Sequence, residues 1–539
     1  MKRLIVCVPG LDGSTTRWNP LIERLQAEEA FRDAEISRFD HNLRWFSKGF
    51  AESYANELAA QVDSYWADQQ YDEICFLAHS IGALLVRHAY LLALLGDPRK
   101  GYEPRPWAAR VSRIILFAGI NRGLFFSIDK DKDEEKAPYK RRRKLARKAI
   151  ELVSALPTHF LLEDLLPGSS FVANIRLSWI RTFHSGSHLP TVVQVLGTRD
   201  WIVTRGDSID LDQFPTGKTI DIPGANHKTV VELGPENQPD NSRYKRLKGA
   251  ILDQHPSTER RNPEECTVVF VLHGIRASNR DWVREASDLL RASLGPKAII
   301  VPATYWYFSA LQFMMMPLRK RRILWFQEKY SYFLSRNPNA SFHFIGHSNG
   351  TYILGHSLRR LRDMRFDKVI LAGSVLPKEF DWTSICSSDN ILRQVQGVWN
   401  HRAQKDVPVG VLCAALRGLG MTDVGTAGYD GFEPIPEVHE CFYYHGGHGA
   451  PLENLPWLLN PITGQEGTMQ RCAELGWFSR ISGISVVLPY VVVLAVAFSS
   501  LLLGPTVAQW VGHGHTALWG AGITASVLVA VISVFLYFL

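Results

Sequence analysis

Two serines occupy nearly identical short motifs, one in each half of the chain. Ser80 lies in AHSIG (78–82) and Ser348 lies in GHSNG (346–350). In both copies an apolar run precedes the serine and a helix-like stretch follows it. Small residues on either side permit the sharp strand-to-helix turn that lifts a serine hydroxyl above a sheet. Each serine is therefore a candidate nucleophile.

A serine hydroxyl becomes an effective nucleophile only when a base takes its proton and a carboxylate orients that base. In the first half Asp200 follows the apolar run at 191–197, and His227 follows the run at 218–223. Strand ends of a parallel sheet meet at one edge, where open α/β sheets place their sites. The spacing predicts a triad of Ser80, Asp200 and His227.

The second half repeats this order. Asp406 follows the apolar run at 392–400, and His448 follows the run at 440–447. The expected second triad is Ser348, Asp406 and His448. The residues that compete less well for the acid and base roles are Asp207, Asp381, His184 and His445. His79 and His347, directly before the serines, are interpreted as packing residues because they point away from the hydroxyl.

Each half opens with an apolar run that leads into a glycine, in VPG (8–10) and LHG (272–274). A glycine lets the backbone curl close to a reacting carbon, so the next N–H can pair with the N–H after the serine. Two such donors would stabilise an oxyanion. The expected donor pairs are Leu11 with Ile81, and Ile275 with Asn349.

The elements that position these residues alternate between short apolar runs and helix-like stretches in both halves. The expected strands are 4–8, 73–78, 113–119, 191–197 and 218–223, followed by 266–274, 341–348, 368–374, 392–400 and 440–447. Near-continuous apolar strands indicate parallel sheets with helices on both faces. The prediction is an α/β chain with domains at 1–254 and 266–470, joined by a linker at 255–265.

These motifs resemble the α/β-hydrolase superfamily, and more closely its compact lipases and esterases. The resemblance covers residues 1–254 and 266–460. It implies hydrolysis of an ester or thioester through an acyl-serine, with no metal and no other cofactor. The fold serves many chemistries, so the substrate and the choice between water and another acyl acceptor stay open.

Ser80 and Asp200 are about twice as far apart in the sequence as Ser348 and Asp406. The extra residues predict an insertion at about 121–188 that caps the first site, and 308–335 is the comparable candidate in the second half. Both segments mix basic and bulky apolar residues, which suits an anionic lipid surface but equally a solvated helical face.

The last part of the chain carries no Asp, Glu, Lys or Arg from residue 481 to 539. It predicts a transmembrane hairpin with spans at 484–503 and 517–539; two buried core helices are the alternative. Arg471 and Arg480 before the first span favour a cytoplasmic body. The net charge of +7 is too dilute to indicate nucleic acid.

Together, the two serine motifs and the uncharged C-terminal segment predict a membrane-anchored serine hydrolase that acts on lipid-like or acylated substrates. Two alternatives stay open: a membrane scaffold that has lost turnover in one or both halves, and a soluble esterase of small esters whose tail is a core hairpin. Labelling of the serines and extraction from membranes would separate the three.

Overall fold

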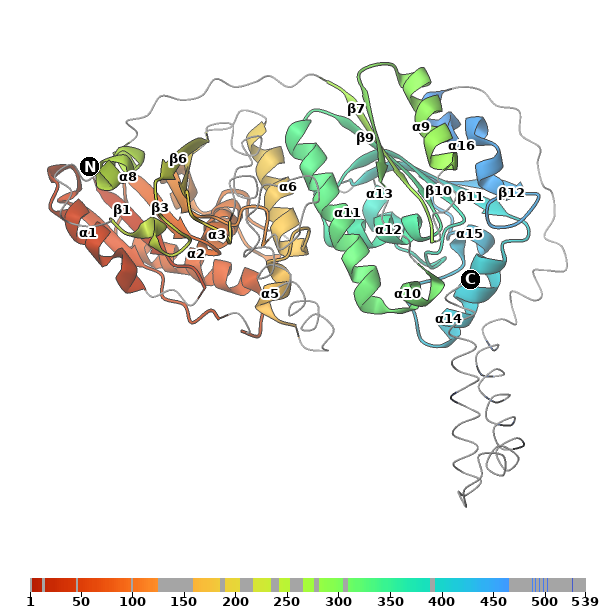
Figure 1. Cartoon of the computed structure of the whole chain (residues 1–539), viewed down its shortest axis with the longest axis horizontal. Coiled ribbons are helices and arrows are strands. Elements are labelled where there is room, and N and C mark those ends of the chain that lie inside the picture. Colours follow the sequence, from red (N-terminus) through yellow and green to blue (C-terminus); the bar gives the residue numbers. More distant parts are fainter. Residues whose placement is uncertain are drawn as a thin grey trace. The chain divides into compact units, whose positions relative to one another are not determined.

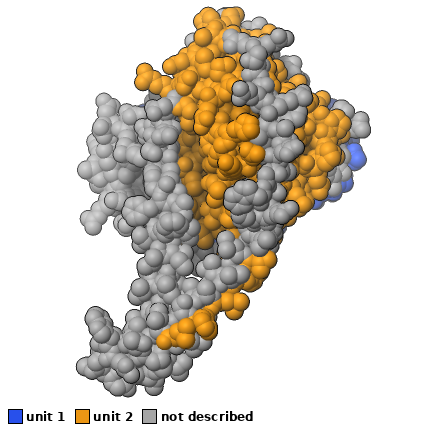
Figure 2. Space-filling view, turned by 90° about the vertical axis from the view of Figure 1, so that its right-hand side faces the viewer, with its two compact units in different colours: residues 1–264, 327–338 blue, residues 265–326, 339–539 orange. Residues whose placement is uncertain are grey.

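The computed structural model describes most of the chain up to residue 464. The described residues are 2–11, 15–44, 47–97, 100–124, 159–184, 190–203, 217–233, 242–252, 265–275, 281–303, 309–387, 393–464 and the single positions Val487, Tyr490, Leu494, Phe498, Leu502 and Ser526. The chain divides into two compact units. The first comprises Met1–Glu264 with Gln327–Pro338, and the second comprises Glu265–Phe326 with Asn339–Leu539 (Figure 2).

The first unit is built on one sheet of six parallel strands in the order β2-β1-β3-β4-β5-β6 (Figure 1). Its strands are β1 (Arg3–Val8), β2 (Ala34–Arg38), β3 (Glu73–His79), β4 (Val111–Phe117), β5 (Thr191–Gly197) and β6 (Lys218–Ile222). Every residue of β3 is buried. Such a strand needs cover on both faces of the sheet.

Helices supply that cover, and alternate residues of the central strands point to the two layers. The layer containing Leu4, Val6 and Val8 packs against α2 (Ala51–Asp68), α3 (Gly82–Leu95) and α6 (Ser170–His184). The layer containing Ile5 and Cys7 packs against α1 (Asn19–Gln26) and α8 (Ser242–Leu252). Shorter elements are η1 (Thr15–Trp18), η2 (Glu29–Phe31), η4 (Pro106–Arg110), α5 (Leu161–Asp164) and η5 (Thr229–Val231).

The second unit repeats the topology, with six parallel strands in the order β8-β7-β9-β10-β11-β12. They are β7 (Thr267–Leu272), β8 (Ala298–Ala303), β9 (Ser341–His347), β10 (Phe366–Ala372), β11 (Val395–Ala403) and β12 (Val438–Tyr444). One face is covered by α9 (Asp281–Leu294) and α16 (Leu455–Thr463).

Further helices of this unit lie near its strand ends or pack on the sheet. They are α10 (Ala310–Met314), the part of α11 (Met316–Arg336) up to Phe326, α12 (Asn349–Arg360), α13 (Trp382–Cys386), η6 (Pro408–Cys413), α14 (Ala414–Gly418), α15 (Ala427–Asp430) and η7 (Ala450–Glu453). Phe326 of α11 makes edge contacts with Phe270 of β7 and Phe344 of β9, so α11 packs directly on this sheet.

The prediction of two α/β bodies with parallel sheets is confirmed, with one correction. The strands β2 and β8 were not expected, and each serine follows the third strand of its unit in chain order rather than the second. Both missed strands lie at a sheet edge. Edge strands bury less surface and give a weaker apolar signal.

The predicted cap at 121–188 stays a prediction, because the structure describes only 121–124 and 159–184 of it. Within this segment, α6 packs against α3 through buried side chains such as Ile175 and Trp179, and so belongs to the body of the unit. Among the described residues of the segment, Leu124 borders the first site. Residues 125–158, with the basic run, lie outside the described residues.

The predicted membrane hairpin falls almost wholly outside the described residues. Within the part of the chain that the structure describes, none of the helices combines the length and the apolar character needed to cross a bilayer.

Candidate active site

Both candidate nucleophiles lie on a sharp turn between a strand and a helix. Ser80 joins β3 to α3 with φ of 54°, and Ser348 joins β9 to α12 with φ of 52°. Among the described residues other than glycine, Ala118 alone shares a positive φ with them. Such a backbone costs on the order of 1 to 3 kcal/mol and is found mainly at functional sites. The amides of both serines are held by carbonyls of the next strand, Phe117 and Ala372, each at 2.9 Å.

A glycine opposite each turn makes room for the serine. A Cβ at Gly10 would lie 2.8 Å from Ser80 Cβ, and a Cβ at Gly274 would lie 2.7 Å from Ser348 Cβ. Real side chains do not approach this closely. The glycine at the end of the first strand of each unit is therefore required by contact with the nucleophile.

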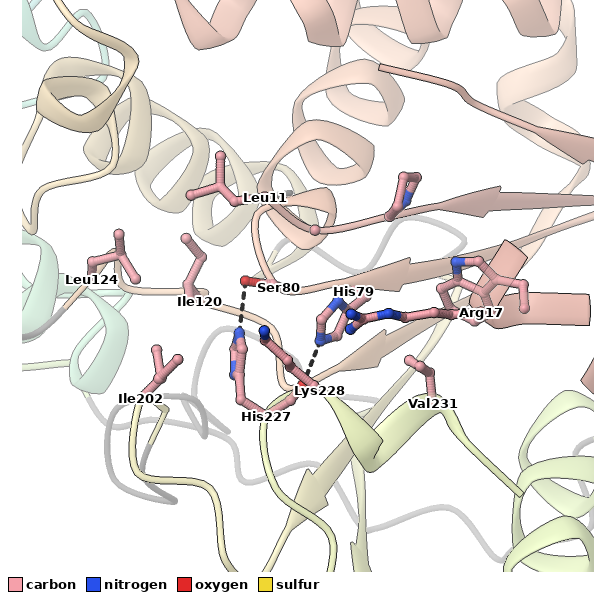
Figure 3. A pocket seen from close by; sticks show the side chains of 13 residues that line it. Leu11, Arg17, His79, Ser80, Ile120, Leu124, Ile202, His227, Lys228 and Val231 are labelled. Atoms are coloured by element: carbon pink, nitrogen blue, oxygen red, sulfur yellow. Dashed lines mark hydrogen bonds between the residues drawn. The ribbon is translucent and has the colours of Figure 1, made fainter. Parts of the chain in front are cut away.

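In the first unit the three predicted side chains form one continuous hydrogen-bond chain. The Ser80 hydroxyl donates to His227 Nε2 at 3.0 Å (Figure 3). His227 Nδ1 in turn donates to Asp200 Oδ2 at 2.8 Å. The other carboxylate oxygen, Asp200 Oδ1, accepts from the amides of Ile202 at 2.9 Å and Val203 at 3.0 Å. All three triad side chains are largely buried. This is the geometry in which imidazole takes the serine proton while the carboxylate orients it.

In the second unit only two of the three members are joined. His448 Nδ1 donates to Asp406 Oδ2 at 2.8 Å, and the carboxylate is fully buried. The other ring nitrogen, His448 Nε2, is buried and has no hydrogen-bond partner among the described residues, so it does not hold the Ser348 hydroxyl.

The residue beneath the imidazole differs between the units. A Cβ at Gly373, which follows β10 with φ of +54°, would lie 2.8 Å from the His448 ring and 3.2 Å from Asp406 Oδ2. The matching position after β4 is Ala118, which also has a positive φ. Glycine at position 373 is therefore required by contact with the His448 ring.

The histidine before each serine holds the backbone of the base. His79 Nε2 donates to the His227 carbonyl at 2.7 Å, and His347 Nε2 donates to the His448 carbonyl at 3.2 Å. Burial lowers the pKa of both His79 and His347 to about 3, so both rings are neutral. Because a carbonyl only accepts, the proton of each neutral ring is assigned to Nε2. The packing role expected from the sequence missed this positioning contact, which the histidine repeated before both serines could have signalled.

The predicted oxyanion donors lie beside the nucleophiles. Leu11 borders the cavity at Ser80, and Ile81 follows Ser80 directly. Within the described part of the chain, the N–H groups of Leu11 and Ile81 have no hydrogen-bond acceptor, so both are available to a developing oxyanion. Ile275 and Asn349 border the cavity at Ser348.

The two cavities differ in size and character. The cavity at Ser80 has a volume of about 110 Å³ and is bordered by both apolar and cationic side chains. The cavity at Ser348 has a volume of about 30 Å³, and its lining carries no charged side chain in the described residues. The first site therefore has the larger of these two cavities as well as the complete triad.

The alternative acid and base residues lie elsewhere or outside the description. Asp381 caps α13, because its Oδ1 accepts from the Ser384 amide at 3.0 Å. His184 ends α6, and His445 is exposed after β12. Asp207 lies outside the described residues.

The first part of the chain is similar in sequence to a known family. Residues 1–118 match the family described as "Putative serine esterase (DUF676)". No curated protein matches the chain. Among solved structures, the chain is similar to the monoacylglycerol lipase of Paleococcus ferrophilus, at 16% identity over 47% of this chain and 95% of that chain, with a TM-score of 0.29. It is also similar to the peroxisomal α/β-hydrolase Lpx1 of Saccharomyces cerevisiae, at 12% identity over 55% of this chain and 87% of that chain, with a TM-score of 0.31.

These TM-scores are low, so the assignment depends on the family match and on the observed topology. Two parallel sheets each carry a serine on a strained strand-to-helix turn, followed in chain order by aspartate and histidine at later strand ends. The resemblance seen in the sequence is confirmed for the fold: both units have the α/β-hydrolase topology, and residues 1–118 match a family of serine esterases.

Proposed function

We propose that the chain is a serine ester hydrolase whose principal active centre is Ser80, His227 and Asp200. The observation that carries this proposal is the unbroken hydrogen-bond chain from the Ser80 hydroxyl to the Asp200 carboxylate, with contacts of 3.0 Å and 2.8 Å. It lies beside a cavity of about 110 Å³.

In the proposed reaction Ser80 Oγ attacks the ester carbonyl carbon while its proton passes to His227 Nε2. The carbonyl oxygen becomes an oxyanion that the N–H groups of Leu11 and Ile81 stabilise; one such donor is typically worth about 3 kcal/mol. His227 then gives its proton to the alcohol oxygen, and the carbon–oxygen bond breaks to leave an acyl-serine. Water, activated by the same imidazole, releases the acid.

Ser348 is proposed as a second nucleophile that needs a rearrangement before it reacts. Its backbone is strained like that of Ser80, and the same unit holds the hydrogen-bonded pair of His448 and Asp406. The absence of a bond from Ser348 to His448 Nε2 in the described residues favours an alternative for this unit, a binding module that keeps the fold without turnover. Hydrogen bonds of catalytic sites often tighten only when substrate is bound. A second nucleophile and a binding module therefore predict different outcomes for the Ser348→Ala variant.

Lipid-like substrates and a membrane anchor are part of the proposal. The uncharged segment at 481–539 supports insertion. Tyr490, within its first predicted span, donates to the Gly418 carbonyl of α14 at 2.8 Å. Near α10 and α14, which border the Ser348 cavity, Met315, Met316 and Leu419 are at least half exposed. Exposed apolar side chains close to a predicted span suit contact with a bilayer on the cytoplasmic side.

The function is tested by turnover of phospholipids and p-nitrophenyl esters by the parent chain, Ser80→Ala, Ser348→Ala and the double variant. We expect Ser80→Ala to remove most of the activity and the double variant to remove all of it. Full activity in the double variant would refute the assignment. If Ser348→Ala matches the parent on every substrate and Ser348 stays unlabelled by a fluorophosphonate, the second unit is the binding module.

Anchoring is tested separately by carbonate extraction of membranes that contain the full chain or residues 1–480. We expect the full chain to stay in the pellet and the truncated chain to be released. Release of the full chain into the supernatant would contradict the anchor and leave the hydrolase proposal standing.

A further inference from the structure

Two cationic side chains border the cavity at Ser80 (Figure 3). Arg17 belongs to η1 and is half-buried, and Lys228 directly follows the base His227 and is exposed. Among the described residues, neither side chain forms an ion pair or a hydrogen bond. Both cations are therefore available to a ligand.

The remaining charge that the described residues place near these cations does not neutralise them. His79, beside Arg17 in the same lining, is neutral, because burial chiefly and the nearby His227 and Arg17 lower its pKa to about 3. The Asp200 carboxylate is already bonded to His227 and to two amides. A cavity with two uncompensated positive charges attracts an anion, and its partly enclosed walls strengthen that attraction.

The other side of the cavity is apolar. Leu11, Ile120, Leu124 and Ile202 lie on one side of Ser80 in Figure 3, and Arg17 lies on the opposite side. Such a lining suits a molecule with a hydrocarbon portion at one end and a negative charge at the other.

The chemistry of the triad orients that molecule. His227 must hand its proton to the oxygen of the leaving alcohol, so the alcohol portion lies near His227. Lys228 is its neighbour in the chain, which puts the positive charge on the leaving-group side. The acyl chain would then lie against the apolar side of the cavity.

We propose that the Ser80 site selects esters whose leaving alcohol carries an anionic group, a phosphate or a carboxylate, with Arg17 and Lys228 as the residues that recognise it. This inference rests on the proposed hydrolase function and gives its substrate class. The second unit offers an internal contrast, since the described lining of the Ser348 cavity is without charge.

The test uses the full chain carrying Ser348→Ala, so that only Ser80 turns over. Three octanoyl esters share one acyl chain and differ in the alcohol: glycerol, glycerol phosphate and glyceric acid. The measured quantity is the ratio of kcat/KM for each anionic ester to kcat/KM for the neutral ester. Comparing the phosphate with the carboxylate ester separates the two sources of charge.

We expect a ratio above about ten for at least one anionic ester, which corresponds to about 1.4 kcal/mol of preferential binding in the transition state. Arg17→Gln should lower the ratio about tenfold, and Lys228→Gln about threefold because an exposed cation contributes less. Arg110→Gln is the matched control: it removes the same charge from an exposed position at the opposite end of the sheet, before β4. Its ratio should equal that of the parent.

Raising the salt concentration should also lower the ratio in the unsubstituted site, a readout that does not depend on the folding of any variant. A ratio near one in the parent, or a ratio that Arg17→Gln and Lys228→Gln leave unchanged, would overturn the inference. Labelling of Ser80 by a neutral fluorophosphonate distinguishes the two failures. Labelling without an anionic preference refutes only the substrate class, whereas no labelling and no turnover refute the hydrolase function as well.

Discussion

The Asp200→Asn substitution tests the triad through one proton. In the parent, Asp200 Oδ1 accepts from the amides of Ile202 and Val203 and Oδ2 accepts from His227 Nδ1. An asparagine has one oxygen and one NH₂ group in place of these two acceptors. If the asparagine NH₂ group pointed at the amides of Ile202 and Val203, two hydrogen bonds of ~0.5 to 1.5 kcal/mol each would be lost, because an NH₂ group cannot accept from an N–H. The amide oxygen must therefore take the Oδ1 position.

The NH₂ group then faces His227 Nδ1, which must become an acceptor, and the ring proton moves to Nε2. In that tautomer His227 cannot take the proton of Ser80. A triad with this substitution loses about 10⁴ in kcat while its geometry is kept. We expect a loss of 10³- to 10⁴-fold here, on the order of 4 to 5.5 kcal/mol in activation free energy, with a change of only about 1 kcal/mol in the free energy of unfolding.

The assay is hydrolysis of a p-nitrophenyl ester by the Ser348→Ala chain with and without Asp200→Asn, alongside thermal unfolding of both. Asp406→Asn in the same background is the matched control, because it makes the same change in the other unit. The control should keep the parent rate. A rate within tenfold of the parent for Asp200→Asn, in a folded protein, would refute the proposed role of His227 as base.

Two further predictions concern stability. Gly82→Ala should lower the free energy of unfolding by about 1 to 3 kcal/mol, because its Cβ would lie 2.7 Å from the rigid Val8 carbonyl. Gly355→Ala should cost less, since its Cβ meets only side-chain atoms, the ends of Leu376 and the ring edge of Phe380; equal losses in chemical denaturation would contradict this. The free energy of unfolding should also fall as the pH is lowered from about 6.5 to 3, by about 1.4 kcal/mol per pH unit for each of His79 and His347. In this pH range both histidines bind a proton in the unfolded chain but stay neutral in the folded chain. His79→Asn should make the fall in denaturation midpoint between pH 7 and pH 5 shallower, and an unchanged slope would count against a neutral buried ring.

Much of the fold could be predicted because the central strands are buried on both faces. β3 and β5 appear in the sequence as near-continuous apolar runs, and the observed strands agree with them. The edge strand β2, AEISR, is only partly buried and has no such run. β8 is more apolar, but Pro302 interrupts it, a residue that sheets tolerate mainly at edges.

The positions of the candidate site residues follow from strand ends, but their exact contacts do not. Asp200 and His227 could be proposed because each follows a strand, and parallel strands end at one edge of the sheet. The missing hydrogen bond between Ser348 and His448 could not be predicted, because it depends on how the side chains of the second unit are placed. Such a difference arises from packing in three dimensions and leaves no pattern in the sequence.

The same holds for α6, whose apolar face packs on α3. A segment of this composition suits either a cap or a core helix, and only the tertiary contacts distinguish the two.

The central claim is that Ser80 is an activated nucleophile, and covalent labelling measures this directly. The full chain is treated with a fluorophosphonate, digested and analysed by mass spectrometry for the modified peptide. We predict an adduct on Ser80 that forms quickly at neutral pH, is lost in Ser80→Ala and forms at least about a hundredfold more slowly in His227→Ala. A folded protein in which Ser80 stays unmodified, or reacts at the same rate without His227, would contradict the account.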